Sequence, residues 1–188
     1  MSDKEIDDII LSDGSHIPRL EEVLEFAKEK RVIILIEPKI HGKEKNLYQK
    51  VVDLINKYDI HKFVKVHSLS LKTVLEIDKL DPKIEVGYTI FGGVGDLSLI
   101  PVDFFSIQET AMKSSLVKRV HLSGRKIYIW TLNETENLKK YLFMGIDGII
   151  TDELELLEKD VKKLKQDLIN KPQYYIDFFG IKLFIPST

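Results

Sequence analysis

The sequence predicts an α/β fold in which a parallel sheet is covered by helices, and three observations support it. Short apolar runs rich in Val and Ile alternate with amphipathic segments of helical period along most of the chain. Gly, Pro and Asp mark the junctions between these segments. Strict alternation of this kind is typical of βα units, whose strands lie parallel and whose helices pack on the sheet.

The first predicted helix begins at Pro18, which suits a first-turn position, and carries Leu20, Leu24 and Ala27 on one face. It leads directly into Val32–Glu37, an uninterrupted apolar run. Such a run is typical of a parallel strand that is fully buried on both faces. We therefore expect the sheet to begin with this strand.

Two further helix–strand pairs follow in the first half of the chain. An amphipathic helix is predicted around residues 47–55, followed by the strand Phe63–His67. A helix over Leu71–Leu80 is broken by Asp81-Pro82, and the strand Ile84–Ile90 comes next. The order strand, helix, strand therefore continues without interruption.

The second half repeats the same order and ends in a different kind of segment. Glycines at 124 and 145 stop two of its helices. In chain order we expect strand Val102–Ile107, helix Glu109–Leu122, strand Lys126–Thr131, helix Glu134–Met144, strand Ile146–Thr151 and helix Glu153–Ile169. We divide the chain into an α/β domain, residues 1–170, and an aromatic C-terminal tail, residues 171–188, whose rings we expect to pack on exposed helices.

Length and composition indicate one ordinary domain. The 188 residues are 44% hydrophobic and 31% charged, which is enough for one sizeable core. A net charge of -2 gives no basic surface, so we expect no nucleic-acid partner. The chain has no cysteine and no apolar run near the roughly 20 residues of a membrane helix. Its first residues, MSDKEIDDII, are acidic, whereas a signal peptide is basic and then apolar, so we expect no signal peptide here. As a lone chain it is expected to be soluble and cytoplasmic.

About six βα units fit two architectures. An open doubly wound sheet usually carries a Gly-rich phosphate loop after its first strand, but here GGVG occurs late and without a G-x-G-x-x-G frame. A full (β/α)₈ barrel usually takes about 250 residues, more than this chain has. The pattern alone leaves both architectures open.

Polar and aromatic residues stand at or just past the predicted strand ends. They are Glu37, Lys39, His67, Ser68, Tyr88, Thr89, Gln108, Trp130, Thr131, Asn133, Thr151 and Asp152. A parallel barrel builds its active site at this rim. Glu37 can bind a hard cation such as Ca²⁺ or Mg²⁺, and Lys39 can pair with phosphate. Any one of these residues can equally be a structural cap, but for Glu37 and Lys39 together we favour function.

Seven segments also carry a family resemblance through their order and spacing. They are IPRLEEVL (17–24), ILIEPK (34–39), VKVHSLS (64–70), EVGYTIFG (85–92), VDFFSI (102–107), HLSGRKIYIWTLN (121–133) and MGIDGIITDE (144–153). Together they resemble the glycerophosphodiester phosphodiesterase family, in particular the branch found behind bacterial membrane domains. Each segment alone is weak; the complete series is specific.

The resemblance implies a TIM-type (β/α) barrel of lipid metabolism that hydrolyses glycerophosphodiesters to glycerol-3-phosphate and an alcohol. In the family, carboxylates hold a divalent cation and two histidines act as general acid and base. Glu37 corresponds to a metal-ligating Glu, Lys39 to a lysine near the phosphate, and Trp130 to an aromatic residue beside the glycerol. Further substrate-lining residues are expected to be His67, Ser68 and Asn133.

The chain contains no counterpart of the family's first two strands, which carry the His-Arg-Gly and Glu-x-Asp motifs, or of the second catalytic His that follows them. We therefore expect an incomplete barrel, the third to eighth βα units, with no catalytic residue of its own, weak or absent metal binding and little activity alone. Its open edges, Val32–Glu37 and Ile146–Thr151, would permit strand exchange between copies.

Two alternatives remain open beside an enzyme fragment. The chain could be a non-catalytic phosphate-binding or interaction module, or one half of a split enzyme that a complementing chain completes. An upstream membrane domain in the parent protein would make it membrane-associated.

Overall fold

The structure is a computed structural model that describes residues 3–39, 46–92, 95–170, 175–178 and 181–184. The helices are α1 (Asp3–Asp7), α2 (Leu20–Lys30), α3 (Leu47–Tyr58), α4 (Leu71–Leu80), α5 (Ser114–Leu122), α6 (Leu138–Met144) and α7 (Leu154–Asn170), with 3₁₀ turns η1 (His61–Phe63) and η2 (Glu109–Ala111). The strands are β1 (Ile34–Ile36), β2 (Val64–Ser68), β3 (Glu85–Ile90), β4 (Phe104–Gln108), β5 (Lys126–Trp130), β6 (Gly148–Ile149), β7 (Tyr175–Phe178) and β8 (Ile181–Phe184).

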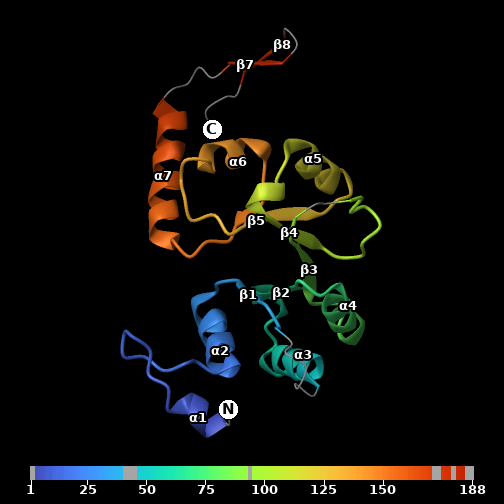
Figure 1. The fold of residues 1–188 in the computed structure, drawn as a ribbon, viewed down its shortest axis with the longest axis vertical. Coiled ribbons are helices and arrows are strands. Elements are labelled where there is room, and N and C mark those ends of the chain that lie inside the picture. The colour runs from blue at the N-terminus through green and yellow to red at the C-terminus, as the bar shows by residue number, and fades with distance from the viewer. Residues whose placement is uncertain (1–2, 40–45, 93–94, 171–174, 179–180, 185–188) are drawn as a thin grey trace. The chain divides into compact units, whose positions relative to one another are not determined.

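The sheet topology decides between the two predicted architectures. Six strands form one sheet in the order β1-β2-β3-β4-β5-β6, which is also their order along the chain. Figure 1 labels β1 to β5 of this sheet. The pairs β1–β2, β2–β3 and β5–β6 are parallel. A doubly wound sheet would reverse its strand order at a switch point, whereas a (β/α) barrel adds each strand beside the last. The fold is therefore an incomplete (β/α) barrel, as predicted.

By its internal contacts the chain divides into two compact units, each described here by itself. The first unit comprises Met1–Thr89 and Ile100–Phe104, and the second comprises Ile90–Leu99 and Phe105–Thr188. In the described part of the chain, no helix is both long enough and apolar enough to cross a membrane.

In the first unit, one face of the strands packs against helices. The register places Val66 beside Val86 and His67 beside Gly87, so that successive residues of β2 point to opposite faces. The helix-facing residues join α2, α3 and α4 in one core: Leu24, Ala27, Val51, Val52, Ile55, Ile60, Val64, Val66, Val74, Ile77, Ile84 and Val86. The alternate residues of β2, Lys65 and His67, are left for the opposite face.

That opposite face is filled by an ion pair and an aromatic ring. Lys65 pairs with Glu85 across β2 and β3, and its Nζ lies 5.8 Å from the centroid of the Phe104 ring. Phe104 is fully buried and lies over Gly87, where a Cβ atom would come within 2.1 Å of the ring. The sequence therefore needs glycine at position 87 so that the ring can lie against the sheet.

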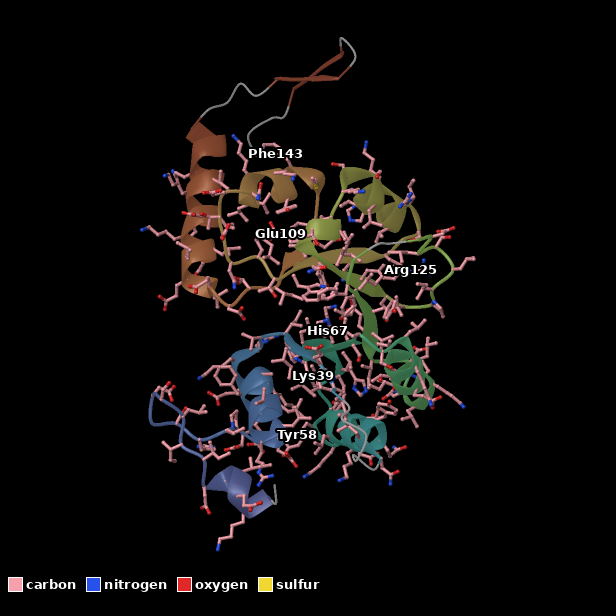
Figure 2. The ribbon with its side chains drawn as sticks, in the orientation of Figure 1. Lys39, Tyr58, His67, Glu109, Arg125 and Phe143 are labelled. Carbon is pink, nitrogen blue, oxygen red and sulfur yellow. The ribbon has the colours of Figure 1, made fainter. Side chains whose placement is uncertain are left out.

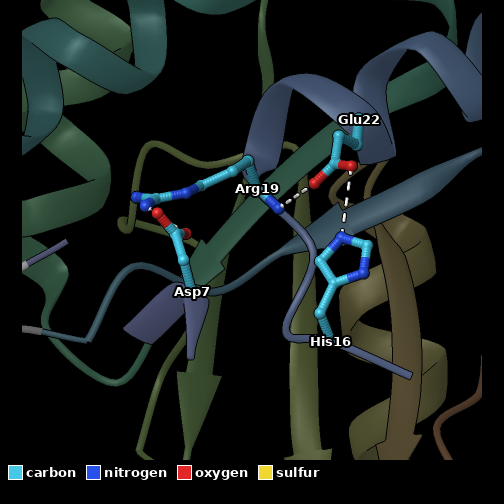
Figure 3. A network of polar contacts seen from close by, with 4 residues as sticks. All are labelled: Asp7, His16, Arg19 and Glu22. Carbon is cyan, nitrogen blue, oxygen red and sulfur yellow. Dashed lines mark hydrogen bonds and ion pairs between the residues drawn. The ribbon is translucent and has the colours of Figure 1, made fainter. Parts of the chain in front are cut away.

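A polar network fixes the start of α2 (Figure 3). The Glu22 Oε2 atom accepts a hydrogen bond from the Arg19 backbone N–H at 2.6 Å, and its Oε1 atom lies 3.3 Å from His16 Nε2. Arg19, the N-cap residue, also pairs with Asp7 of α1 through its guanidinium group. The Arg19 N–H first, and then His16, lower the pKa of Glu22. Pro18 lies outside the helix, not in its first turn as predicted.

A buried carboxylate makes the stability of the first unit depend on pH. Asp81 is 8% exposed, its Oδ2 atom lies 2.9 Å from His61 Nε2, and Oδ1 accepts the Lys83 N–H at 3.0 Å. The hydrogen bond with His61 is the largest cause of the lowered pKa of Asp81. The stabilisation is therefore complete above the ordinary pKa of 3.8 and is lost as the pH falls through the lower folded value.

We expect Asp81→Asn to lower the free energy of unfolding by about 1–3 kcal/mol at pH 7, because it weakens a buried, charge-assisted hydrogen bond. The difference from the wild type should shrink below about pH 4, where unfolded aspartate is protonated. Urea unfolding between pH 7 and pH 3 measures this difference. Asp59→Asn, at an exposed site in the same unit, is the matched control. A pH-independent difference for Asp81→Asn would contradict the assignment.

The second unit contains most of β4, with β5 and β6, and helices α5, α6 and α7. Its buried core residues include Phe105, Ile107, Leu116, Val117, Val120, Ile127, Ile129, Leu132, Leu138, Tyr141 and Leu157. A carboxylate anchors the entry to β6, since Asp147 Oδ2 accepts the Ile127 N–H at 2.8 Å and lies 2.9 Å from His121 Nε2. The bond to Ile127 ties β6 to β5 beside their backbone ladder.

The terminal strands of the sheet differ most from the sequence prediction. The strand predicted over Val32–Glu37 is only Ile34–Ile36, all three residues are half-buried, and Ile33 is 61% exposed. The prediction of a fully buried strand is wrong, because β1 is the end strand of the described sheet and has a neighbour on one side only. The other end strand, β6, is likewise shorter than predicted and half-buried.

The C-terminal tail contains a hairpin. β7 and β8 pair antiparallel, with Tyr175 opposite Phe184 and Phe178 opposite Ile181, and form a separate two-stranded sheet. The side chains of residues 171–188 lie outside the described structure, so the packing predicted for their aromatic rings stays a prediction. The division into residues 1–170 and 171–188 also stays a prediction.

Candidate active site

In the first unit, the acidic and basic side chains singled out from the sequence lie together at the end of β1. Glu37 Oε2 and Lys39 Nζ are 3.4 Å apart, and the side chains are 29% and 67% exposed. Pro38, which separates them, is buried. Glu37 is therefore partly shielded from water, whereas the Lys39 ammonium is available to a ligand.

His67 comes from the neighbouring strand β2 and is labelled with Lys39 in Figure 2. The charges of Glu37 and Lys39 both act on its imidazole. It is 7% exposed, and its Nδ1 atom lies 3.1 Å from Thr89 Oγ1 on β3. Burial is the main cause that lowers the pKa of His67. The negative charge of Glu37 raises this pKa, and the positive charge of Lys39 lowers it further. The imidazole is therefore neutral at neutral pH, and its contact with Thr89 fixes the ring.

A cavity of about 560 Å³ opens beside Glu37 and Lys39. It is lined by Glu37, Pro38, Lys39, Tyr48, Ser68, Leu69, Ser70 and Thr73. Hydroxyl groups dominate the polar part of this lining and are linked to one another: the hydroxyl oxygens of Tyr48 and Thr73 are 3.1 Å apart. The buried Ser68 hydroxyl donates to the Pro38 carbonyl at 3.5 Å and accepts the Ser70 N–H at 3.2 Å. Hydroxyls beside an ammonium suit an anionic, oxygen-rich ligand.

Two of the residues that line the cavity could not be predicted from the sequence, because they do not stand at the end of a predicted strand. Tyr48 belongs to α3 and Thr73 to α4, where the sequence pattern only distinguishes a buried face from an exposed one. Ser70 has a local signal, because it is the N-cap of α4 and accepts the Thr73 N–H at 3.3 Å.

This cap gives a testable stability effect. Ser70→Ala is expected to lower the free energy of unfolding by about 1 kcal/mol, because the α4 N-terminus loses its side-chain acceptor. Ser70→Asn should retain most of the wild-type stability, since Asn caps helices equally well. Urea unfolding of the three proteins measures the effect. If alanine and asparagine destabilise equally, the Ser70 side chain does not act as the cap.

In the second unit, Trp130 ends β5 and is held from two sides. Its indole Nε1–H donates to the Ser106 carbonyl of β4 at 3.0 Å. The Phe91 ring packs on it with centroids 5.6 Å apart and planes inclined by 55°, although Phe91 itself is 68% exposed. Trp130 is therefore a fixed, half-buried aromatic wall, and Phe91 extends that wall into solvent. Sequence reasoning passed over Phe91.

Asn133 joins the ends of β5 and β6. Its Nδ2 donates to Asp152 Oδ2 at 3.0 Å, and its Oδ1 accepts from the Thr151 hydroxyl and the Asp152 N–H at 3.1 and 2.9 Å. The amide is thus engaged at both ends in a structural link between two loops. The substrate contact predicted for Asn133 stays a prediction.

The described residues of the first unit do not make a complete cation site. Ca²⁺ usually takes about 6–8 oxygen ligands, whereas Glu37 is the one carboxylate in the cavity lining and has an ammonium 3.4 Å away. Across the whole described part of the chain, no three His, Asp or Glu side chains are close enough together to hold a metal. These residues alone do not fit the divalent cation that the resemblance implies.

Comparisons with known proteins show which family the chain belongs to. A family model for the glycerophosphoryl diester phosphodiesterase family matches residues 2–156. The chain is 28% identical over 156 residues to YhdW of Bacillus subtilis strain 168, and 27% identical over 161 residues to the glycerophosphodiester phosphodiesterase of Caldanaerobacter subterraneus. These matches cover 79% and 80% of this chain, but 64% of each relative.

Solved structures show the same fold. A glycerophosphodiester phosphodiesterase from Parabacteroides distasonis superposes with a TM-score of 0.77 at 23% identity, covering 88% of this chain and 72% of that one. A phosphodiesterase from Oleispira antarctica, solved with the product sn-glycerol-3-phosphate, gives 0.69 at 18% identity, covering 78% and 62%. At these identities the likeness is evidence for the fold alone.

Proposed function

Because the chain belongs to the glycerophosphoryl diester phosphodiesterase family, we propose that its strand-end cavity binds the phosphate of a glycerophosphodiester or of its product, sn-glycerol 3-phosphate. One observation carries the proposal: the exposed Lys39 ammonium stands at a cavity whose other polar groups are mainly hydroxyls. A lysine pairs with phosphate as a point charge, and hydroxyls donate hydrogen bonds to its oxygens. The binding of sn-glycerol-3-phosphate by the Oleispira antarctica protein supports this ligand class.

The residues of the cavity have distinct roles in this proposal. Lys39 neutralises phosphate charge, while the hydroxyls of Tyr48 and Ser70 can donate to the phosphate oxygens. The Glu37 carboxylate would repel the phosphate, so its role is not phosphate binding. Its position beside Lys39 is suitable for one ligand of a divalent cation, whose remaining ligands would have to come from other groups.

Hydrolysis in this proposal needs groups that the described residues do not supply. General acid–base catalysis needs a positioned pair and contributes roughly 10²–10⁴-fold to the rate. Three histidines are each engaged with a carboxylate through Nε2: His16 with Glu22, His61 with Asp81, and His121 with Asp147. His67 is buried beside Thr89, and His41 lies outside the described residues. We therefore expect the 188-residue chain on its own to bind the ligand with little or no turnover.

The end strands favour a split or fragmentary enzyme over a self-sufficient module. The three residues of β1 are all apolar, yet each is only half-buried, which suits a further strand along that edge. The curated relatives are longer than the matched region, and two more βα units would complete the barrel. The partner is then a complementing segment, upstream or on another chain; strand exchange between copies is the competing outcome.

Titration with sn-glycerol 3-phosphate tests the binding site. Addition of the ligand should shift the backbone NMR signals of Lys39, Ser68 and Ser70, with a midpoint that is at least about tenfold higher in Lys39→Ala, because one charge-assisted contact is lost. Lys62→Ala, which removes an exposed lysine from the same unit, should leave the midpoint unchanged. Equal effects of the two variants, or no shift at these residues, would reject the site.

A further inference from the structure

A second cavity, of about 420 Å³, lies wholly within the second unit. It is lined by Gly92, Thr110, Ala111, Lys113, Ser115, Leu116 and Arg119, which come from the segment after β3, from η2, from the N-cap of α5 and from α5 as far as its last turn. None of these residues belongs to the cavity beside Lys39. Its volume is in the range of small-molecule sites, about 300–1,000 Å³.

The charges in this cavity have one sign. Among the described residues that line it, both charged side chains are cations, Lys113 and Arg119. Within the described part of the chain Lys113 makes no ion pair, so no carboxylate of that part neutralises its charge. Thr110 and Ser115 add hydroxyl donors, and Leu116, only 3% exposed, forms an apolar wall.

The neighbouring carboxylates are already engaged. Asp96 accepts a hydrogen bond from the Ser98 backbone N–H at 2.9 Å. This bond and a second one from the Ser98 hydroxyl are the main causes that lower the pKa of Asp96, and the charge of Arg119 lowers it further. Glu109 Oε1 accepts the Tyr141 hydroxyl at 3.0 Å, and burial with this carboxylate raises the pKa of Tyr141 to about 12. Asp96 therefore compensates part of the Arg119 charge, while Lys113 keeps its own.

We propose that this cavity is a second anion site that takes a phosphate group, either inorganic phosphate or the phosphate of a small phosphomonoester. A guanidinium presents paired N–H donors that match phosphate oxygens, and an ammonium adds a point charge beside it. The hydroxyls of Thr110 and Ser115 can complete the donor set, and Leu116 can pack on the carbon part of an ester. The proposal does not depend on the function assigned to the Lys39 cavity.

The test uses the whole chain in the Lys39→Ala background, so that the first cavity does not contribute. Inorganic phosphate and sn-glycerol 3-phosphate are titrated separately while the backbone NMR signals of Gly92, Ser115 and Leu116 are followed. Saturable shifts with either ligand support the site. Tighter binding of inorganic phosphate identifies the free ion as the ligand, and tighter binding of the ester identifies a phosphomonoester.

Three variants decide which side chains hold the anion. Lys113→Gln and Arg119→Gln should each weaken binding at least about tenfold, because each removes a charge-assisted contact. Lys118→Gln removes the same charge from the same helix but does not line the cavity, and should leave binding within about twofold. Shifts that chloride reproduces at equal ionic strength, or a Lys118→Gln effect as large as the other two, would overturn the proposal.

Discussion

Replacing Phe104 by alanine is expected to lower the free energy of unfolding of the first unit by about 3–5 kcal/mol. The ring is fully buried and lies against Gly87. Its centroid is 6.4 Å from that of the His67 ring. Removing the Phe104 ring would open a cavity over the sheet, and the Lys65–Glu85 ion pair would then border that cavity. Because β2 and β3 would lose their main cover on this face, the loss is large for a single substitution.

Phe91→Ala is the matched control, because it removes the same side chain from a site that is 68% exposed. It should cost less than about 1 kcal/mol, as surface substitutions do. Urea unfolding of both variants gives the comparison. The NMR titration of His67 provides a second readout: in Phe104→Ala its lowered pKa should return toward 6.5, because burial is its main cause. Similar costs for the two variants would contradict the packing described here.

Joining this chain to the part of a relative that its match does not cover is expected to produce hydrolysis. In such a fusion, sequence from outside the 64% of the Caldanaerobacter subterraneus enzyme that the match covers is placed ahead of residue 1, where the proposal requires two further βα units. We expect turnover of glycerophosphocholine in the presence of Ca²⁺ or Mg²⁺. Glu37→Ala should lower kcat of the fusion at least about 100-fold, because even an outer-shell contact to a metal is worth about 10–100-fold.

Glu76→Ala in the same fusion is the control, since it removes a carboxylate of α4 that does not line the cavity beside Lys39. Its kcat should match that of the unchanged fusion. A folded fusion with no turnover would reject the proposal that the chain lacks only those two units. Equal losses in Glu37→Ala and Glu76→Ala would reject the role of Glu37.

Much of the fold follows from local patterns, but the ends of the sheet do not. The alternation of apolar runs and amphipathic segments predicted the six strands of the sheet, because each element carries its own period. The burial of Val32–Glu37 could not be predicted in this way. It depends on whether another strand lies beside β1, and that is a property of the sheet rather than of the run.

The residues of the candidate site were likewise predicted only in part. Glu37, Lys39, His67 and Ser68 were predicted because the carboxyl ends of adjacent parallel strands meet at one rim. Tyr48 and Thr73 reach the cavity from helices, and the contact between His67 and Thr89 depends on the register of β2 and β3. Side chains that meet through tertiary packing leave no spacing in the sequence by which they could be found.

The most direct test of the central claim is a phosphodiesterase assay of the 188-residue chain itself. Glycerophosphocholine is supplied with Ca²⁺ or Mg²⁺, and released glycerol 3-phosphate is measured for the wild type and for Glu37→Ala. We predict that both proteins give the same background rate, while the wild type still binds sn-glycerol 3-phosphate. Turnover by the wild-type chain that disappears in Glu37→Ala would contradict the account, because the chain would then hold a working active site by itself.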